Sequence, residues 1–420
     1  MVTKLSKIRD LSKAERNIYI LAFTSLLLNI AVNLYDPFLS LYFINLSAST
    51  ALLGIVFAVY RVAYAVAMLP GGYLADRFGR KNLIVIGSLV FAAFLLPMSL
   101  AGSWILALAF LVCAQLGISM YQPGTSAMIA ESLTSEARAA GFGKFWSIVM
   151  VGSLIGPVIA GYLSMGSNYG ILFLFASLIM FGVTFIRFKF LVETKKGVIL
   201  KNASKEGFVD KLKLIWGVGS GVKFYLIYSC ISEFGFQLMI PYMSVYWGYV
   251  IHMNEFLIGI GFATFMLFMI LSQIPGGKLS DRIGRKPCLI VSAFGSTVTT
   301  IVMLFCTDPA QVILMQALGG VFAGLGHGPH EALSAELVDE SVRGTALGVF
   351  RTTSGLIGAI GPLAAGLICG VYSFEVYPKI IFYLYGAVNS VAAILLALFV
   401  EETLNKYSLR DEKSPQQMSS

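Results

Sequence analysis

The sequence predicts an all-α membrane protein with twelve transmembrane helices, arranged as two parallel six-helix repeats. Three observations predict this fold. The composition is 57% hydrophobic and 12% charged, whereas about 25% of the residues of soluble domains are charged. Apolar runs of helical length recur along the 420 residues, and one charged loop sequence occurs twice. With a mean hydropathy of +0.80, the chain cannot be a water-soluble globular protein.

Twelve apolar runs are each long enough to cross a bilayer as a helix, which takes about 20 residues. They cover residues 17–45, 51–70, 83–101, 103–130, 144–164, 169–188, 223–247, 257–276, 288–306, 310–335, 345–369 and 379–400. The first run is too long for a signal-peptide core and has no small-residue cleavage site, so we expect a retained helix. The predicted divisions are an N-terminal bundle, a linker, a C-terminal bundle and a tail, at 1–188, 189–222, 223–400 and 401–420.

The distribution of Lys and Arg predicts the orientation of the chain in the membrane. Of the 30 cations, 27 fall in the tails and alternate loops on one side, nine of them at 187–223, and only Lys379 lies on the other side. The last two, Arg61 and Arg351, lie inside predicted spans. The positive-inside rule then places both termini and the 189–222 segment in the cytoplasm. The net charge of +8 is explained by topology and lipid head groups, and we expect no nucleic-acid partner.

A twelve-residue loop segment shows that the chain is internally repeated. The sequence PGGYLADRFGRK at 70–81 returns as PGGKLSDRIGRK at 275–286, with nine of twelve positions identical at an offset of 205. Six spans, a linker and six spans in the same orientation form the parallel repeat found in alternating-access carriers. In such carriers a site near the middle of the membrane is exposed to each side in turn.

This loop resembles the signature loop of the major facilitator superfamily, and the span count, linker and chain length agree with its twelve-span form. In that family the loop latches the outward-facing state. The resemblance assigns this role to Gly72, Asp76, Arg77, Gly79, Arg80, Lys81, Asp281, Arg282, Gly284, Arg285 and Lys286. Asp76, at a helix end, is expected to face the positive N-terminus of another helix. A plain positive-inside turn would explain the cations but not the repeated Asp and Gly.

Two further pairs of charges recur at the cytoplasmic ends of the fourth and tenth spans. They are Glu131 and Arg138, and their copies Glu336 and Arg343. In the family such charges form a cytoplasmic gate network, so these residues are candidates to pair with the loop charges. The alternative is that they are ordinary solvated end charges, each contributing under about 1 kcal/mol.

The fifth span contains the sequence GSLIGPVIAG, which is similar to the antiporter motif associated with exporters, with Ala160 replacing one glycine. The motif positions are Gly152, Gly156, Pro157 and Gly161. Small residues four apart let two helices touch, and proline bends a helix. A related run begins at Gly358, so generic helix packing is the alternative. Cys113 occupies the place of the arginine found in the fourth span of proton-coupled drug exporters.

Polar residues follow one face of the first and seventh spans. The main ones are Asn29, Asn33, Asp36, Glu233 and Gln237. Because polar groups facing lipid cost several kcal/mol, we expect these stripes to face a shared aqueous cavity, although packing within the bundle could also satisfy them. Arg61 needs an acid such as Asp36, or an anionic substrate. We predict that Asp36 and Arg61 form a charge pair and that Glu233 carries the proton.

The tenth span places His327, His330 and Glu331 on one face around Pro329. Three interpretations remain open for this cluster: a protonatable relay, a satisfied packing cluster, and a metal site. No second cluster of metal-ligating residues is apparent in the sequence, so we do not predict a bound metal ion. Arg351, early in the eleventh span, could either join a polar site or extend to the cytoplasmic face.

The sequence favours a secondary active transporter of small organic solutes that exports its substrate in exchange for protons. The alternative is a proton-coupled symporter that takes up a small metabolite such as a sugar, organic anion or amino acid. A membrane enzyme is less favoured because no nucleophile–base pair appears, and no GxxxxGK[ST] segment exists for nucleotide binding. Five scattered cysteines form no CxxC pair. We expect a monomer in the plasma membrane, without a cofactor.

Overall fold

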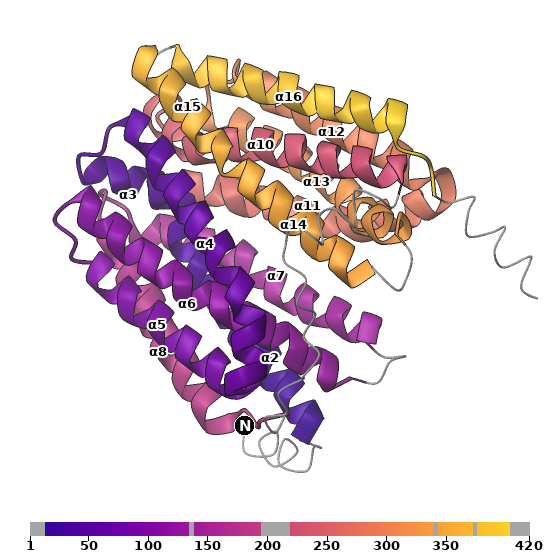
Figure 1. Ribbon diagram of the computed structural model, residues 1–420. Helices are drawn as coiled ribbons and strands as arrows, with labels where there is room; N and C mark the ends of the chain where they lie inside the picture. The colour runs from indigo at the N-terminus through magenta and orange to yellow at the C-terminus, as the bar shows by residue number, and fades with distance from the viewer. Residues whose placement is uncertain (1–12, 134–137, 195–218, 339–342, 373–375, 404–420) are drawn as a thin grey trace, which may run out of the picture. The chain divides into compact units, whose positions relative to one another are not determined.

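The structure, a computed structural model, describes residues 13–133, 138–194, 219–338, 343–372 and 376–403, which contain helices and short connections but no β-strand (Figure 1). The first half of the chain forms α2 (Lys13–Tyr35), η1 (Asp36–Phe38), α3 (Leu39–Asn45), α4 (Thr50–Phe78), α5 (Arg80–Met98), α6 (Trp104–Glu131), α7 (Arg138–Leu163) and α8 (Gly170–Phe190). The second half forms α10 (Ser220–Tyr249), α11 (Glu255–Ile283), α12 (Arg285–Met303), α13 (Pro309–Glu336), α14 (Arg343–Gly358), α15 (Ile360–Val371) and α16 (Tyr377–Phe399).

Each predicted apolar run coincides with one of these helices or with a broken pair of them. Eleven segments of the described chain are long and apolar enough to cross a membrane. The run at 223–247 forms helix α10, but it is not among the eleven. Ser229, Glu233 and Gln237 contribute to this result, because polar side chains lower the mean hydropathy of the helix. The first span is interrupted by η1, whose second residue is Pro37, since proline cannot donate a helical hydrogen bond.

The helices pack into two compact units. The first contains the described residues of 1–203 together with 247–263, and the second contains those of 204–246 and 264–420. In the first unit, α5 packs against α6 and α8, while α2 packs against α7 and α8. In the second unit, α12 packs against α13 and α16. Helices α5 and α12 therefore hold corresponding places in the two repeats.

Two glycines form the sharp junctions of the repeated loop. Gly79 joins α4 to α5 with φ +89°, and Gly284 joins α11 to α12 with φ +107°. Residues with a side chain adopt such positive φ values only with strain, whereas glycine does so freely. Each junction thus consists of a single residue, and the charged residues that follow it begin the next helix.

Candidate transport site and gate charges

In the first unit, the start of α5 is held by a network of charges. The Arg80 guanidinium pairs with Glu131, with 2.9 Å between Nη2 and Oε1. The carboxylate of Glu193 accepts hydrogen bonds from the backbone N–H groups of Arg80 at 3.1 Å and Lys81 at 3.0 Å. Thr194 donates to the second oxygen of Glu131 at 2.7 Å. Glu193 therefore satisfies N–H groups that have no partner within the helix, where the positive end of the helix dipole favours an anion.

The second unit repeats this arrangement at the start of α12. Arg285 pairs with Glu336, with 3.2 Å between Nη2 and Oε1. The carboxylate of Glu402 accepts from the N–H groups of Arg285 at 3.0 Å and Lys286 at 2.9 Å. Thr403 donates to the second oxygen of Glu336. In each half of the chain, a carboxylate that follows the sixth span caps the third span of that half.

Glu193 and Glu402 were missed by sequence reasoning. They lie in the segments predicted as the linker and the tail, and their offset is 209 rather than the 205 that relates the loops. The signal that could have found them is the Glu-Thr dipeptide that follows each terminal apolar run, at 193–194 and 402–403.

The other predicted gate residues contribute less to these networks. Asp281 pairs with Arg285 across the α11–α12 junction, and Arg282 is exposed. The exposed Arg77 places its guanidinium 5.5 Å from the centre of the Phe78 ring. The surroundings of Gly72 and the side chains of Asp76, Arg138 and Arg343 lie outside the described part of the structure. The predicted contact of Asp76 with a helix N-terminus falls among these.

The asparagines of the first span contact the glycine run of the fifth. Asn33 donates to Asn29 Oδ1 at 3.1 Å, and Ser153 on α7 donates to the same oxygen at 2.7 Å. A Cβ added at Gly152 would lie 2.9 Å from the Asn29 Cβ, and one at Gly156 would lie 2.6 Å from the Asn33 Cβ. The two asparagines therefore take part in a close helix contact that requires glycine on α7.

The end of the same glycine run meets the start of α11 within the first unit. A Cβ at Gly161 would lie 2.6 Å from the Glu255 carbonyl oxygen, and one at Gly259 would lie 2.2 Å from the Pro157 carbonyl oxygen. The Glu255 carboxylate also accepts from the Ser167 hydroxyl at 3.2 Å. These backbones approach so closely that no side chain fits between them.

Tyr60 lies between the predicted charge pair of the first unit. Its hydroxyl donates to Asp36 Oδ1 at 3.3 Å, and the Arg61 guanidinium lies 5.4 Å from the centre of its ring. Among the described ion pairs, none joins Asp36 to Arg61 within 4.0 Å. The tyrosine thus connects the two charges by one hydrogen bond and one cation–π contact.

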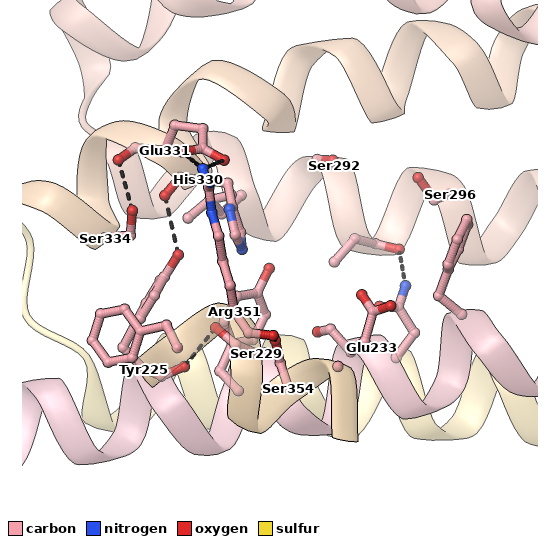
Figure 2. A pocket seen from close by; sticks show the side chains of 18 of the residues that line it. Tyr225, Ser229, Glu233, Ser292, Ser296, His330, Glu331, Ser334, Arg351 and Ser354 are labelled. Carbon is pink, nitrogen blue, oxygen red and sulfur yellow. Dashed lines mark hydrogen bonds and ion pairs between the residues drawn. The ribbon is translucent and has the colours of Figure 1, made fainter. Parts of the chain in front are cut away.

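The second unit contains a cavity of about 450 Å³ (Figure 2), lined by residues of α10, α12, α13, α14 and α16. Such a volume lies within the range of roughly 300–1,000 Å³ that is typical of ligand pockets. Six serines line it: Ser229, Ser232, Ser292, Ser296, Ser334 and Ser354. Its ionisable residues other than tyrosine are Glu233, His330, Glu331 and Arg351. The cavity wall therefore carries many polar and ionisable groups, although it lies in a bundle of apolar helices.

The predicted polar residues take specific places around this cavity. Glu233 accepts a hydrogen bond from Gln237 at 2.7 Å, and Arg351 pairs with Glu331, with 3.2 Å between Nη2 and Oε2. Figure 2 shows Glu233 apart from the Glu331–Arg351 pair. His327 is not part of the lining and contacts Gln273 on α11 through Nδ1 at 2.9 Å. The structure thus brings Glu233, His330 and Glu331 to one cavity and leaves His327 outside it.

The sequence model described as the Major Facilitator Superfamily matches residues 21–260 and 225–420. The chain belongs to the major facilitator superfamily. It is a multi-pass membrane transporter rather than an enzyme, and in bacteria and archaea such proteins lie in the plasma membrane. It is 28% identical to an MFS-type transporter of Methanocaldococcus jannaschii, over 93% of this chain and 96% of the relative.

Other similar proteins include both an efflux pump and a proton symporter. The multi-drug resistance efflux pump PmrA of Streptococcus pneumoniae is 22% identical, over 86% of this chain and 90% of the pump. The crystal structure of a D-xylose-proton symporter superposes with a TM-score of 0.75 and 15% identity, covering 93% of this chain and 99% of that one. These similarities show the superfamily fold but leave the direction of transport open.

This superfamily member also carries a buried cation that the sequence did not reveal. Arg187 has no exposed surface, whereas from the sequence it counted only as one of the cations on the cytoplasmic side. Its guanidinium donates to the hydroxyls of Thr24 at 3.1 Å, Ser88 at 2.6 Å and Ser25 at 3.4 Å. It also lies 4.9 Å from the centre of the Tyr121 ring. Arg187 thus connects α8 to α2, α5 and α6.

Replacing Arg187 with lysine is expected to destabilise the first unit by about 1–3 kcal/mol, because a single ammonium group cannot reproduce the planar fork that contacts several helices. The melting temperature of the purified transporter measures this effect. Lys189→Arg, at an exposed position of the same helix, is the matched control and should leave the melting temperature unchanged. An Arg187→Lys variant that melts with the wild type would contradict the structural role of this residue.

Proposed function

We propose that this transporter is a monomeric, twelve-span, proton-coupled exporter of small organic solutes that works by alternating access. Its two six-helix repeats are 1–188 and 223–400, and the termini and the 189–222 segment lie in the cytoplasm. The cation distribution supports this orientation. The repeated networks of Arg80 and Arg285 support a cytoplasmic gate, because each network fixes the end of a loop whose residues are proposed to latch the outward-facing state.

The observation that carries the coupling proposal is the position of Glu233 in the wall of the polar cavity. Its carboxylate accepts a hydrogen bond from Gln237, and no cation of the described chain forms an ion pair with it. A carboxylate at a cavity surface can bind a proton from one side and release it to the other. Glu233 is accordingly the proton carrier, while Asp36 and Arg61 act as a charge pair that Tyr60 connects and that shapes the transport path on the side of the first unit.

Export is supported by the glycine run of α7, which packs as the antiporter motif would require, and by the similarity to an efflux pump. Uptake by proton symport is the second candidate. It is favoured by the serine-rich lining of the cavity in the second unit, because hydroxyls suit a hydrophilic metabolite better than a lipophilic drug.

Glu233→Gln is expected to uncouple transport from the proton gradient while retaining solute exchange at equal pH and saturating solute concentration, since glutamine keeps the shape of the side chain but cannot carry the proton. Inside-out proteoliposomes loaded with a pH-sensitive dye measure this directly. Solutes from drug, sugar, amino-acid and organic-anion panels are added outside. An exporter that exchanges protons makes the lumen more alkaline, whereas a symporter makes it more acidic.

Asp308→Asn serves as the control for loss of a carboxylate, because Asp308 caps α13 from an exposed position and asparagine caps helices equally well. This variant should retain the pH response. Asp36→Asn should impair both driven transport and exchange. A Glu233→Gln transporter that still responds at the normal rate would reject Glu233 and direct attention to Asp36, or to His330 and Glu331.

A further inference from the structure

The described lining of the cavity in the second unit contains two carboxylates but one arginine, so one carboxylate has no cation to neutralise it. Glu331 is paired with Arg351, whereas the Glu233 carboxylate is hydrogen-bonded to the neutral amide of Gln237. Within the described lining, Arg351 is the sole Lys or Arg. A ligand that neutralises Glu233 would be a cation, and an anion would meet an uncompensated negative charge.

Several neutral groups of the cavity wall can only accept hydrogen bonds from a ligand, because they already donate their own hydrogens within the protein. Ser229 and Ser334 donate to carbonyls one turn earlier in their own helices, at 2.9 and 2.8 Å. Tyr225 donates to a carbonyl of α13 at 3.0 Å. The Asn389 amide nitrogen donates to two α12 acceptors, each at 2.9 Å. These groups retain free oxygen lone pairs, whereas the Ser232 hydroxyl has no hydrogen-bond partner in the described structure and can also donate. A complementary ligand therefore carries hydroxyl groups, which both donate and accept hydrogen bonds.

We infer that this cavity binds a small hydrophilic cation, an amine that also carries several hydroxyl groups, with Glu233 as the partner of its ammonium group. The inference rests on the proposal that the cavity is the substrate site, and it names the class of substrate. The ammonium group donates to Glu233, and the ligand hydroxyls donate to the oxygens of Ser229, Ser334 and Asn389. A lipophilic cation would neutralise the charge but would leave these oxygens without partners.

The test is a binding measurement on the full-length transporter purified in detergent, by isothermal titration and thermal shift at neutral pH. N-methylglucamine, sorbitol and gluconate are the probes, because each has a six-carbon polyhydroxy chain and they carry a positive charge, no charge and a negative charge, respectively. Tetraphenylphosphonium serves as the lipophilic cation. N-methylglucamine should bind about tenfold or more tightly than the other three, since only it offers both a charge-assisted hydrogen bond and hydroxyl donors.

Three variants locate the binding. Glu233→Gln should weaken N-methylglucamine binding about tenfold or more. Ser229→Ala should weaken binding less, because this change removes one neutral acceptor and leaves the charge of Glu233 in place. Asp308→Asn should bind like the wild type. The melting temperature of each variant without ligand confirms that it is folded.

Several results would overturn the inference: equal binding of sorbitol, preference for gluconate or tetraphenylphosphonium, full affinity in folded Glu233→Gln, or no binding of N-methylglucamine at millimolar concentration. The assay uses neither a membrane nor a proton gradient. If proton-driven export fails while N-methylglucamine binds through Glu233, the substrate class stands and the coupling is wrong. If export succeeds without this binding, the substrate class is wrong.

Discussion

Replacing Gly156 with leucine is expected to abolish transport and to destabilise the first unit. A Cβ at this position would lie 2.6 Å from the Asn33 Cβ and 3.0 Å from the Ile30 carbonyl oxygen. Because both are part of α2 or directly attached to it, that helix would have to move away from α7. Overpacking of this kind typically costs about 1–3 kcal/mol. The displaced helix continues into η1, which carries Asp36.

The matched control is Gly143→Leu on the same helix. Gly143 has no atom within 4 Å of its ideal Cβ position, so the larger side chain should be tolerated. Melting temperature and transport in proteoliposomes are measured for both variants. The close-contact interpretation of the glycine run fails if the two leucine variants behave alike.

Replacing Gly79 with alanine is expected to release the carboxylate that caps α5. The new Cβ would lie 2.7 Å from Glu193 Oε2, and the positive φ of this residue disfavours any side chain. Backbone strain contributes about 1–3 kcal/mol, because φ +89° with ψ +149° is a region that essentially only glycine adopts, and loss of the cap adds about 0.5–2 kcal/mol. Hydrogen exchange at the amides of Arg80 and Lys81 should become faster, because these N–H groups lose their acceptor.

Gly284→Ala should produce the same acceleration at the start of α12, where Glu402 is the cap and φ is +107°. Gly277→Ala is the control within the repeated loop. No atom lies within 4 Å of the ideal Cβ position of Gly277, and the φ of this residue is not positive. Unchanged exchange in Gly79→Ala would show that Glu193 does not hold these amides in solution.

The helices could be predicted from the sequence because the signal is local. A run of apolar residues must form its hydrogen bonds internally in a membrane, so its length and position determine the helix. The repeated loop could also be recognised from the sequence, because nine of its twelve residues are identical in the two copies. Even α10 was found as an apolar run, although Glu233 and its polar neighbours lower its hydropathy.

The partners of the charged residues could not be predicted in the same way, because they depend on packing between distant segments. Arg187 lies at the end of an apolar run, as an exposed cation would, and its burial follows from the hydroxyls of α2 and α5. Tyr60 has no special spacing from Asp36 in the sequence. Glu193 and Glu402 fall outside the offset that relates the loops, so comparing the two halves did not align them.

The carboxylates that cap α5 and α12 limit where the chain can be truncated or joined to a tag. Glu402 and Thr403 follow the last helix by only a few residues, where affinity tags and fluorescent fusions are commonly attached. A truncation after Phe399, the last residue of α16, would remove the Glu402 cap of α12 and the hydrogen bond of Thr403 to Glu336 at the end of α13, although every helix of the described chain remains. Purification tags are better joined after Thr403. A split version expressed as two fragments should keep Glu193 and Thr194 with the first fragment.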